Sequence, residues 1–125
     1  MILLIDAHAV LWWLADDPTL EDVARSAMAD PANQVLVSAA TIWEIEIKRA
    51  LGKLAAPTGL CDVIERAGFG VLPISGLDAE RAGALPGLHR DPFDRMLVAQ
   101  ARRLDALIVS RDASFAPYGV DVLPA

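Results

Sequence analysis

The sequence predicts an α/β fold in which helices cover both faces of a central parallel sheet. Short apolar runs that suit buried strands alternate with amphipathic segments along the whole chain, a pattern typical of parallel sheets. With 125 residues, the chain is long enough for a core of its own. Its hydrophobic fraction of 54% argues against disorder. We therefore expect a single domain over residues 1–125.

The N-terminal half begins with a strand and a strongly apolar helix. The apolar run 1–5 ends at Asp6, and the helix predicted over 7–15 ends before Asp17-Pro18. In this helix the residues from Ala9 to Leu14 are all apolar, so we expect one of its sides to serve an interface, unless the next helix covers it. Further expected elements are a helix opened by Thr19 and ending near 29, a strand over 35–37, and a helix over 39–51 between Ser38 as cap and Gly52.

The C-terminal half continues the same alternation. The run 71–74 carries Pro73, which places this strand at an edge of the sheet. Asp91 suits the cap of a helix and Pro92 its first position, and apolar residues then recur at helical spacing to Leu104. The other expected elements are a helix from the cap Thr58 to 67, a helix over 77–85, a strand over 106–109, a helical turn over 113–116 and a strand over 120–123.

Charge and cysteine content limit the possible functions. The net charge of −6 argues against a generic nucleic-acid binder but permits an acidic metal site or a basic partner. No basic region precedes the first apolar run, which Asp6 interrupts, so we expect neither a signal peptide nor a membrane span. The lone Cys61 is expected to be a small core residue in a reducing cytoplasm.

Four acids are predicted to meet at one end of the sheet. Asp6 ends the first strand, Asp112 lies just past the fourth, and Asp94 starts the helix that leads to that strand. Glu44 lies in the helix after the second strand. Ligands of parallel sheets bind beyond the carboxyl ends of the strands, so these acids share a cleft if the first and fourth strands are neighbours. Crowded carboxylates repel each other, which favours a bound divalent cation such as Mg²⁺ or Mn²⁺.

Each acid also has an ordinary interpretation. Asp6 and Asp112 can cap the helical segments that follow them, and Asp91 with Asp94 resembles a capping box. The lone histidines His8 and His89 show no ligand spacing, which favours polar roles on a loop or helix face.

Helical geometry separates Glu44 from Glu46. At 3.6 residues per turn, Glu44 lies at the edge of an apolar stripe with Trp43 and Leu51, whereas Glu46 lies on a solvated face with Arg49. A glutamate beside a buried stripe needs a partner or a function. Lys48, four residues on, is its possible partner.

Four segments with acidic residues follow one another in order across nearly the whole chain. They are Ile2-Leu3-Leu4-Ile5-Asp6-Ala7-His8-Ala9-Val10-Leu11-Trp12-Trp13-Leu14, Ser38-Ala39-Ala40-Thr41-Ile42-Trp43-Glu44-Ile45, Asp91-Pro92-Phe93-Asp94-Arg95-Met96-Leu97-Val98-Ala99-Gln100-Ala101 and Val109-Ser110-Arg111-Asp112. Together they resemble the motifs of the PIN-domain family, and the most similar subgroup is the VapC-type toxin of bacterial type II toxin–antitoxin pairs. One departure is that Ala7 and His8 stand where many members have Ser or Thr.

The resemblance implies a three-layer α/β/α fold whose five short parallel strands lie in the order 3-2-1-4-5. It implies a cytoplasmic Mg²⁺- or Mn²⁺-dependent endoribonuclease, with Asp6, Glu44, Asp94 and Asp112 as its acidic site. Of these, Asp6, Asp94 and Asp112 would hold the metal. A cognate antitoxin and a homodimer are the implied protein partners, and RNA is the implied substrate.

The cations nearest to these motifs are expected to attract RNA or to pair with the acids; they are Lys48, Arg90, Arg95 and Arg111. Two other functions fit the same acids. One is a PIN-like interaction module without catalysis. The other is a metal-dependent phosphohydrolase for small molecules with Asp6 as nucleophile, although His8 stands where that class usually has a second acid.

Overall fold

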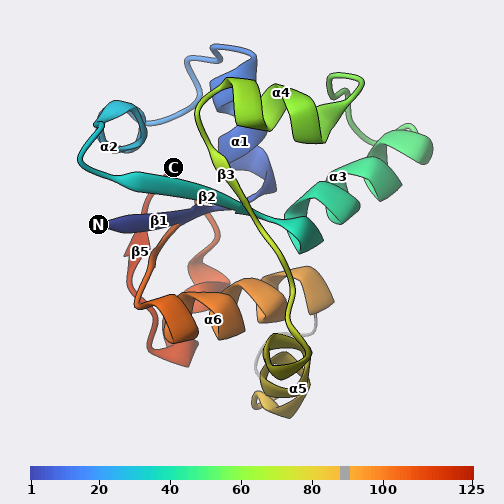
Figure 1. Ribbon diagram of the computed structural model, residues 1–125, viewed down its shortest axis with the longest axis vertical. Coiled ribbons are helices and arrows are strands. Elements are labelled where there is room, and N and C mark those ends of the chain that lie inside the picture. Colours follow the sequence, from blue (N-terminus) through green and yellow to red (C-terminus); the bar gives the residue numbers. More distant parts are fainter. Residues whose placement is uncertain (88–90) are drawn as a thin grey trace.

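One parallel sheet organises the molecule, and its five strands lie in the order β3-β2-β1-β4-β5 (Figure 1). The computed structural model describes residues 1–87 and 91–125, so the predicted roles of His89 and Arg90 lie outside the described residues. The order is the one that the resemblance implies, and β1 pairs with both β2 and β4. The strands are β1 (Ile2–Ile5), β2 (Gln34–Ser38), β3 (Gly70–Leu72), β4 (Leu107–Val109) and β5 (Val122–Leu123).

Helices cover the two faces of this sheet, as predicted. In Figure 1, α1, α2 and α4 lie on one side of the strands, whereas α6 and α5 lie on the other. No helix within the described ranges has the length and apolar character needed to cross a membrane. The helices are α1 (Ala7–Leu14), α2 (Asp22–Ala29), α3 (Ala39–Ala50), α4 (Leu60–Arg66), α5 (Gly76–Ala84) and α6 (Pro92–Leu104), and a 3₁₀ helix, η1, spans Ala113–Tyr118.

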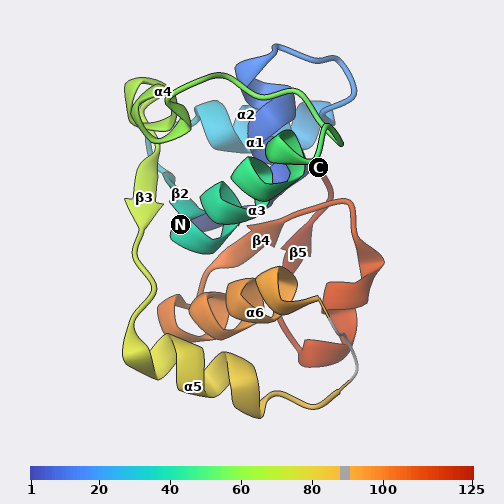
Figure 2. The ribbon, with the colours of Figure 1, turned by 90° about the vertical axis from the view of Figure 1, so that its right-hand side faces the viewer.

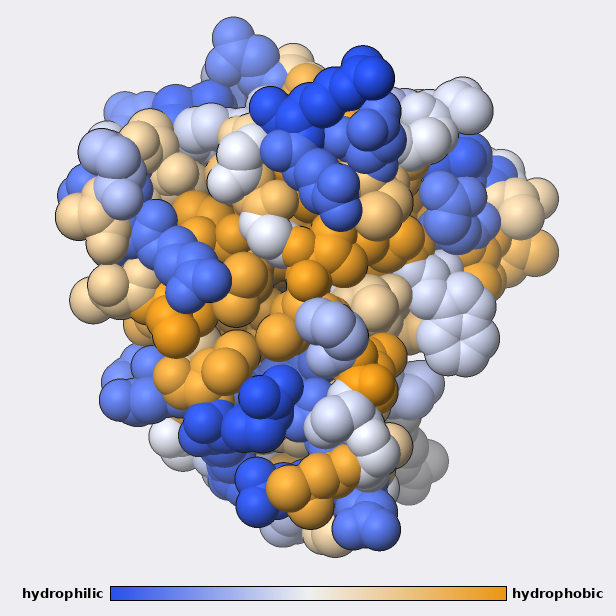
Figure 3. All heavy atoms as spheres, viewed as in Figure 1, coloured by the Kyte–Doolittle hydropathy of each residue, from blue (hydrophilic) through white to orange (hydrophobic). Residues whose placement is uncertain are grey.

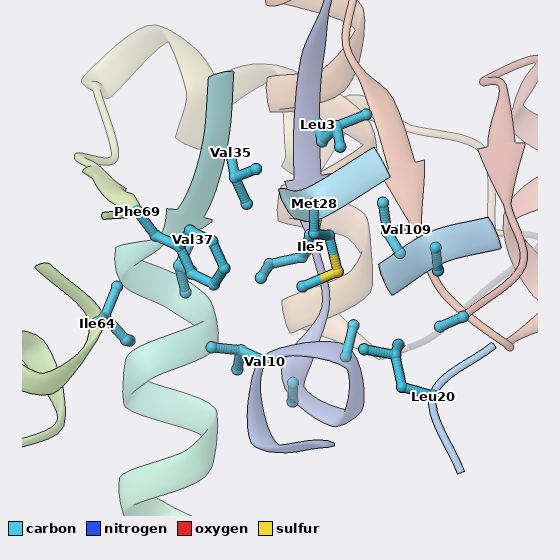
Figure 4. Packing of buried hydrophobic residues seen from close by; sticks show 14 of the residues in the cluster. Leu3, Ile5, Val10, Leu20, Met28, Val35, Val37, Ile64, Phe69 and Val109 are labelled. Carbon is cyan, nitrogen blue, oxygen red and sulfur yellow. The ribbon is translucent and has the colours of Figure 1, made fainter. Parts of the chain in front are cut away.

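The pleat of the strands divides the core between the two faces. Leu3 and Ile5 of β1 belong to the cluster under α1, α2 and α4, which includes Val10 and Ile64 (Figure 4). Leu4, between them, belongs to the opposite cluster under α6 and η1. Successive side chains of a strand point to opposite faces, so a strand buried on both sides is apolar at every position. This explains the unbroken apolar run before Asp6.

The edge strand β3 lies where Pro73 places it, at the end of the sheet. Pro73 directly follows β3, and Ile74 and Leu77 beyond it are among the exposed large hydrophobic residues. In Figure 3 hydrophobic side chains gather across the middle of this face, where β3 crosses it, with hydrophilic side chains above and below. Proline cannot donate to a further strand, so it limits pairing at this edge.

Two helix starts differ from the prediction because of local backbone geometry. The helix predicted from the cap Thr58 begins only at Leu60, since Gly59 occupies the cap position with a left-handed φ of 67°. Glycine adopts this conformation without steric cost, and it redirects the chain after Thr58. The helix expected to open at Thr19 begins at Asp22, with Glu21 at its cap.

Three side chains that the sequence analysis placed in or beside the core are exposed to solvent. Cys61, predicted to be a core residue, is exposed, because α4 buries Leu60 and Ile64 and turns Cys61 away from the sheet. Trp43 and Leu51, predicted to border the buried stripe of α3, are each 62% exposed. The core-facing side of α3 is therefore narrower than its apolar pattern suggests.

The apolar helix α1 is covered from more than one side. Trp12 and Trp13 are both half-buried, as expected for neighbours that project about 100° apart. The Trp13 ring packs against Phe69, 5.4 Å away, and Trp12 lies 4.6 Å beneath the Arg111 guanidinium. Phe69, just before β3, therefore covers part of Trp13. The sequence predicts only the helix after Thr19 for this role. The predicted interface on α1 stays a prediction.

A buried ion pair joins α5 to α6. The Asp78 side chain is fully buried and accepts hydrogen bonds from Nε and Nη2 of Arg103 at 2.7 and 3.1 Å. Ser75 and Gln100 also donate to it. Burial raises the pKa of Asp78, but these hydrogen bonds outweigh burial and bring the pKa from 3.8 to about 2. The ionised form of Asp78 is therefore the one that the fold stabilises.

We expect the stabilisation from Asp78 to disappear in acid. Because its folded pKa is depressed, its contribution is present above about pH 4 and is lost as the pH falls toward 2. The shift corresponds to about 2 kcal/mol in the free energy of unfolding. Urea unfolding of the wild type and Asp78→Asn should show a large difference at pH 6 that shrinks by about that amount near pH 2. A difference that is independent of pH would contradict this account.

Candidate acidic functional site

A hollow beyond the carboxyl ends of the strands brings the four predicted acids together. Its volume is about 140 Å³. Figure 2 shows α3 and α6 next to each other. Residues of both helices line the hollow. Pairing of β1 with β4 sets Asp6 and Asp112 at adjacent strand ends. The lining residues are Asp6, Ala7, His8, Glu44, Lys48, Asp91, Asp94, Arg111 and Asp112.

Asp6 combines its two predicted roles. Its Oδ1 accepts the backbone N–H of Ala9 at 2.9 Å and caps α1, while its Oδ2 accepts the Ser110 hydroxyl at 2.5 Å. The pKa of Asp6 is raised from its ordinary value, mainly by burial; the hydrogen bonds from Ser110 and Ala9 and the charge of His8 oppose this rise, and the charge of Asp112 adds to it. The Asp6 carboxylate can therefore cap α1 and line the hollow at the same time.

Ser110 is a site residue that the sequence reasoning missed. It is 1% exposed, and its Oγ also accepts the backbone N–H of Asp112 at 3.0 Å. One hydroxyl therefore links the acids at the ends of β1 and β4. It stands beside Asp6 although Ala7 and His8 replace the usual hydroxyl residues of that motif. Ser110 lies two residues before Asp112, inside a segment that resembles a motif of the family, and this position could have identified it as a site residue.

The start of α6 supplies two acids to the hollow. Asp91 caps the helix as predicted, because its Oδ1 accepts the backbone N–H of Phe93 at 2.9 Å and that of Asp94 at 3.4 Å. Asp91 also lines the hollow, which the sequence reasoning did not anticipate. The positive end of the helix dipole favours negative charge here. Asp94 is therefore held in the first turn, beside the other acids.

Asp112 begins η1 in the same manner. Its Oδ1 accepts the backbone N–H of Ser114 at 2.9 Å and the Ser114 hydroxyl at 2.7 Å. The predicted turn or cap role of Asp112 is thus confirmed, and the residue lines the hollow as well.

Glu44 and Glu46 have the separate environments that their helix faces predict. Glu44 is 8% exposed and pairs with Lys48 at 2.9 Å, while Glu46 pairs with Arg49 at 2.8 Å and does not line the hollow. The hydrogen bond with Glu44 raises the pKa of Lys48, burial opposes this, and the charges of Asp91 and Asp94 add to it. Lys48 is therefore a positive charge held among the acids.

Two of the arginines expected near the site, Arg95 and Arg111, are described by the structure, and backbone carbonyls accept hydrogen bonds from both. Arg95 donates to the carbonyl oxygens of Gly83, Leu85 and Pro86, at the end of α5. Arg111 lines the hollow, but its guanidinium donates to the carbonyls of Ala125 and Thr19 and stacks over Trp12. Both side chains hold chain segments around the site.

The donor atoms suit a hard divalent cation. Carboxylate oxygens are the ligands that Mg²⁺ and Mn²⁺ prefer, and Mg²⁺ usually keeps several of its waters. The hollow has room for a few water molecules at about 30 Å³ each. In residues 1–87 and 91–125, no three acid, histidine or cysteine side chains already stand close enough to hold one ion together. The chemistry therefore fits a hydrated ion rather than a closed protein cage.

Comparison with known proteins gives one family and one fold. The family described as PIN domain matches residues 3–120. The fold is similar to VapBC2 from Rickettsia felis bound to a promoter DNA fragment (TM-score 0.69, 13% identity, 98% of each chain covered). It is also similar to DNA-bound VapBC from Salmonella typhimurium (0.69, 18%, 98% of this chain and 97% of that chain). A third match is a toxin–antitoxin complex from Klebsiella pneumoniae (0.65, 20%, 98% and 96%). No curated protein matches the chain.

Proposed function

Because this chain belongs to the PIN-domain family, we propose that it is a metal-dependent endoribonuclease and the toxin of a toxin–antitoxin pair. The observation that carries the proposal is the gathering of Asp6, Glu44, Asp94 and Asp112 around one hollow at the carboxyl edge of the sheet. Each acid comes from a different segment, so capping alone does not explain why they meet.

We assign a separate role to each of the acids and to the residues that contact them. Asp6, Asp94 and Asp112 would hold Mg²⁺ or Mn²⁺, which when bound would activate water for in-line attack on a phosphodiester and offset the charge on its oxygens. Ser110 keeps the Asp6 carboxylate in place through its hydroxyl. Glu44, anchored by Lys48, can accept a proton from the attacking water. The same lysine offsets repulsion between the acids before the substrate arrives.

A cleavage assay with metal control tests this function. The chain is incubated with a fluorescein-labelled single-stranded RNA of mixed sequence in Mg²⁺, Mn²⁺ or EDTA, and the products are sized. Internal cleavage with either metal and none in EDTA is expected. Intact RNA under all conditions would favour the interaction module, whereas release of phosphate from p-nitrophenyl phosphate without RNA cleavage would favour the phosphohydrolase.

A toxin of this type would act in the cytoplasm on RNA, be held by an antitoxin and form a homodimer. The fold shared with complexes described as VapBC or toxin–antitoxin supports the antitoxin partner. We therefore propose that a neighbouring gene encodes the antitoxin.

The helix α1 is the expected protein contact, and its two tryptophans should differ. Trp13 lines a second hollow of about 380 Å³, together with Phe69, whereas Trp12 stacks on Arg111 beside the acids. We expect Trp13→Ala to weaken antitoxin binding or self-association about tenfold or more, and Trp12→Ala to do so less. Light scattering and titration with the purified antitoxin measure this on folded protein. Loss of thermal stability alone in both variants would identify α1 as core.

A further inference from the structure

An aromatic pair stands beside the acidic hollow without lining it. Trp43 of α3 and Phe93 of α6 meet edge to face, with ring centroids 5.4 Å apart and planes at 77°. Each ring directly precedes an acid of the hollow, since Glu44 follows Trp43 and Asp94 follows Phe93. Consecutive Cα atoms are about 3.8 Å apart, so both rings begin within one residue of the site. We call Trp43 and Phe93 the aromatic pair.

The exposure of Trp43 is unusual for so large an apolar ring. It is 62% exposed, while Phe93 is half-buried and supports it from one side. A tryptophan normally contributes to stability by burial, and little of that gain is realised here. The contact with Phe93 nevertheless limits the orientations of the indole. The ring is therefore both accessible and preorganised.

Negative charge at the site opposes the binding of RNA phosphates, whereas an aromatic ring can bind an uncharged base. The chain carries a net charge of −6, and five acids line the hollow, so phosphates are repelled until a cation is bound. Arg95 and Arg111 are anchored by backbone carbonyls, and Lys48 is ion-paired with Glu44. A nucleobase, in contrast, presents an uncharged face that stacks on aromatic rings whatever its identity.

We propose that the aromatic pair is a stacking platform for a base of single-stranded RNA, next to the phosphodiester that is cleaved. Trp43 offers the stacking face and Phe93 fixes its orientation. The proposal rests on the proposed ribonuclease function, because it places the base relative to that site. It predicts tolerance of base identity but a strict need for an aromatic ring at position 43.

Binding to RNA without cleavage tests the platform directly. Fluorescence anisotropy with the labelled RNA is measured in Mn²⁺, on chains that carry Glu44→Gln so that cleavage is slow. Trp43 is compared with Trp43→Ala, Trp43→Leu and Trp43→Phe in this background. We expect Trp43→Ala and Trp43→Leu to raise the Kd about tenfold and Trp43→Phe to keep it near the value with Trp43. Leu51→Ala is the matched control, since Leu51 follows the same helix and is equally exposed but does not stand next to an acid of the hollow. It should leave the Kd unchanged.

An RNA with one abasic nucleotide locates the stacked base. Abasic sites are placed in turn beside the cleaved bond, and kcat and KM are measured with Mn²⁺ for the wild type and Trp43→Ala. At the stacked position the abasic RNA should raise the wild-type KM about tenfold, and Trp43→Ala should add no further loss. Full additivity at every position would overturn the platform.

The outcomes separate the platform from the function on which it rests. If the wild type cleaves and binds RNA but Trp43→Ala changes neither, the platform is wrong and the ribonuclease stands. If Trp43→Leu binds RNA like the wild type, a general apolar contact replaces stacking. If Trp43→Ala alters only the mass measured by light scattering, the aromatic pair belongs to a contact between two copies. A wild type that neither binds nor cleaves RNA overturns both proposals.

Discussion

Asp94→Asn is expected to reduce RNA cleavage at least about 100-fold and to weaken Mn²⁺ binding by a similar factor. Loss of a residue that only supports a metal ligand typically costs 10- to 100-fold, so loss of a ligand should cost at least as much. Asparagine keeps the size of the side chain and one oxygen but removes its negative charge. The measurements are the cleavage rate in Mn²⁺ and calorimetric titration of the protein with Mn²⁺.

The fold should survive this change. Asp94 lies in the first turn of α6, where a negative charge contributes about 0.3–1 kcal/mol through the helix dipole. Asp62→Asn is the matched control, because Asp62 also lies in a first turn but is 64% exposed and pairs with Arg66. Both variants should melt near the wild type, and only Asp94→Asn should lose Mn²⁺. Equal Mn²⁺ affinity in Asp94→Asn and the wild type would remove Asp94 from the metal site.

Features with a local cause are the ones that the sequence predicts well. Helix α6 runs from Pro92 to Leu104 as predicted, because Asp91 and Pro92 fix its start from neighbouring atoms alone. Gly52 follows α3 with a φ of 71°, as its predicted place after the helix requires. The strand order came from the resemblance to the family, since periodicity alone does not say which strands pair.

Features that depend on distant segments were missed or misjudged. Ser110 joins the site because β4 pairs with β1, which sets it beside a residue 104 positions earlier in the chain. Arg95, which the sequence places near RNA or the acids, also donates to carbonyl oxygens at the end of α5, and helical spacing does not reveal these contacts. The exposure of Trp43 likewise depends on how far α6 covers α3. Helical spacing gives the face of a side chain but not what packs on that face.

The meeting of the acids at one hollow depends partly on local sequence and partly on contacts between distant segments. Parallel strands place their carboxyl ends at one edge, so Asp6 and Asp112 were expected to meet once β1 and β4 were neighbours. Glu44 and Asp91 reach the same hollow because α3 and α6 contact each other beyond that edge. The sequence could rank Glu44 above Glu46, but only the packing of α3 against α6 gives Glu44 a place among the other acids.

Glu44→Gln is expected to lower kcat/KM for RNA about 100-fold, while Glu46→Gln changes it less than about twofold. Each substitution breaks one ion pair at helical spacing, at 2.9 Å to Lys48 and 2.8 Å to Arg49. The exposed pair of Glu46 should contribute below about 1 kcal/mol to stability, and the more buried pair of Glu44 should contribute more, so thermal melting is recorded for both variants. Only Glu44 lines the hollow, where a carboxylate that accepts a proton typically contributes 10²- to 10⁴-fold.

Lys48→Met separates the carboxylate of Glu44 from the ion pair that holds it. If the ion pair alone matters, Lys48→Met should lose as much activity as Glu44→Gln; if the carboxylate itself acts, Lys48→Met should retain more. Cleavage rates in Mn²⁺ and thermal melting of all three variants measure this. A larger loss in Glu46→Gln than in Glu44→Gln would contradict the orientation of α3, because Glu46 would then have to face the substrate. The side chain of Glu44 is 10% exposed and that of Glu46 is 43% exposed, so we expect Glu44→Gln to cause the larger loss.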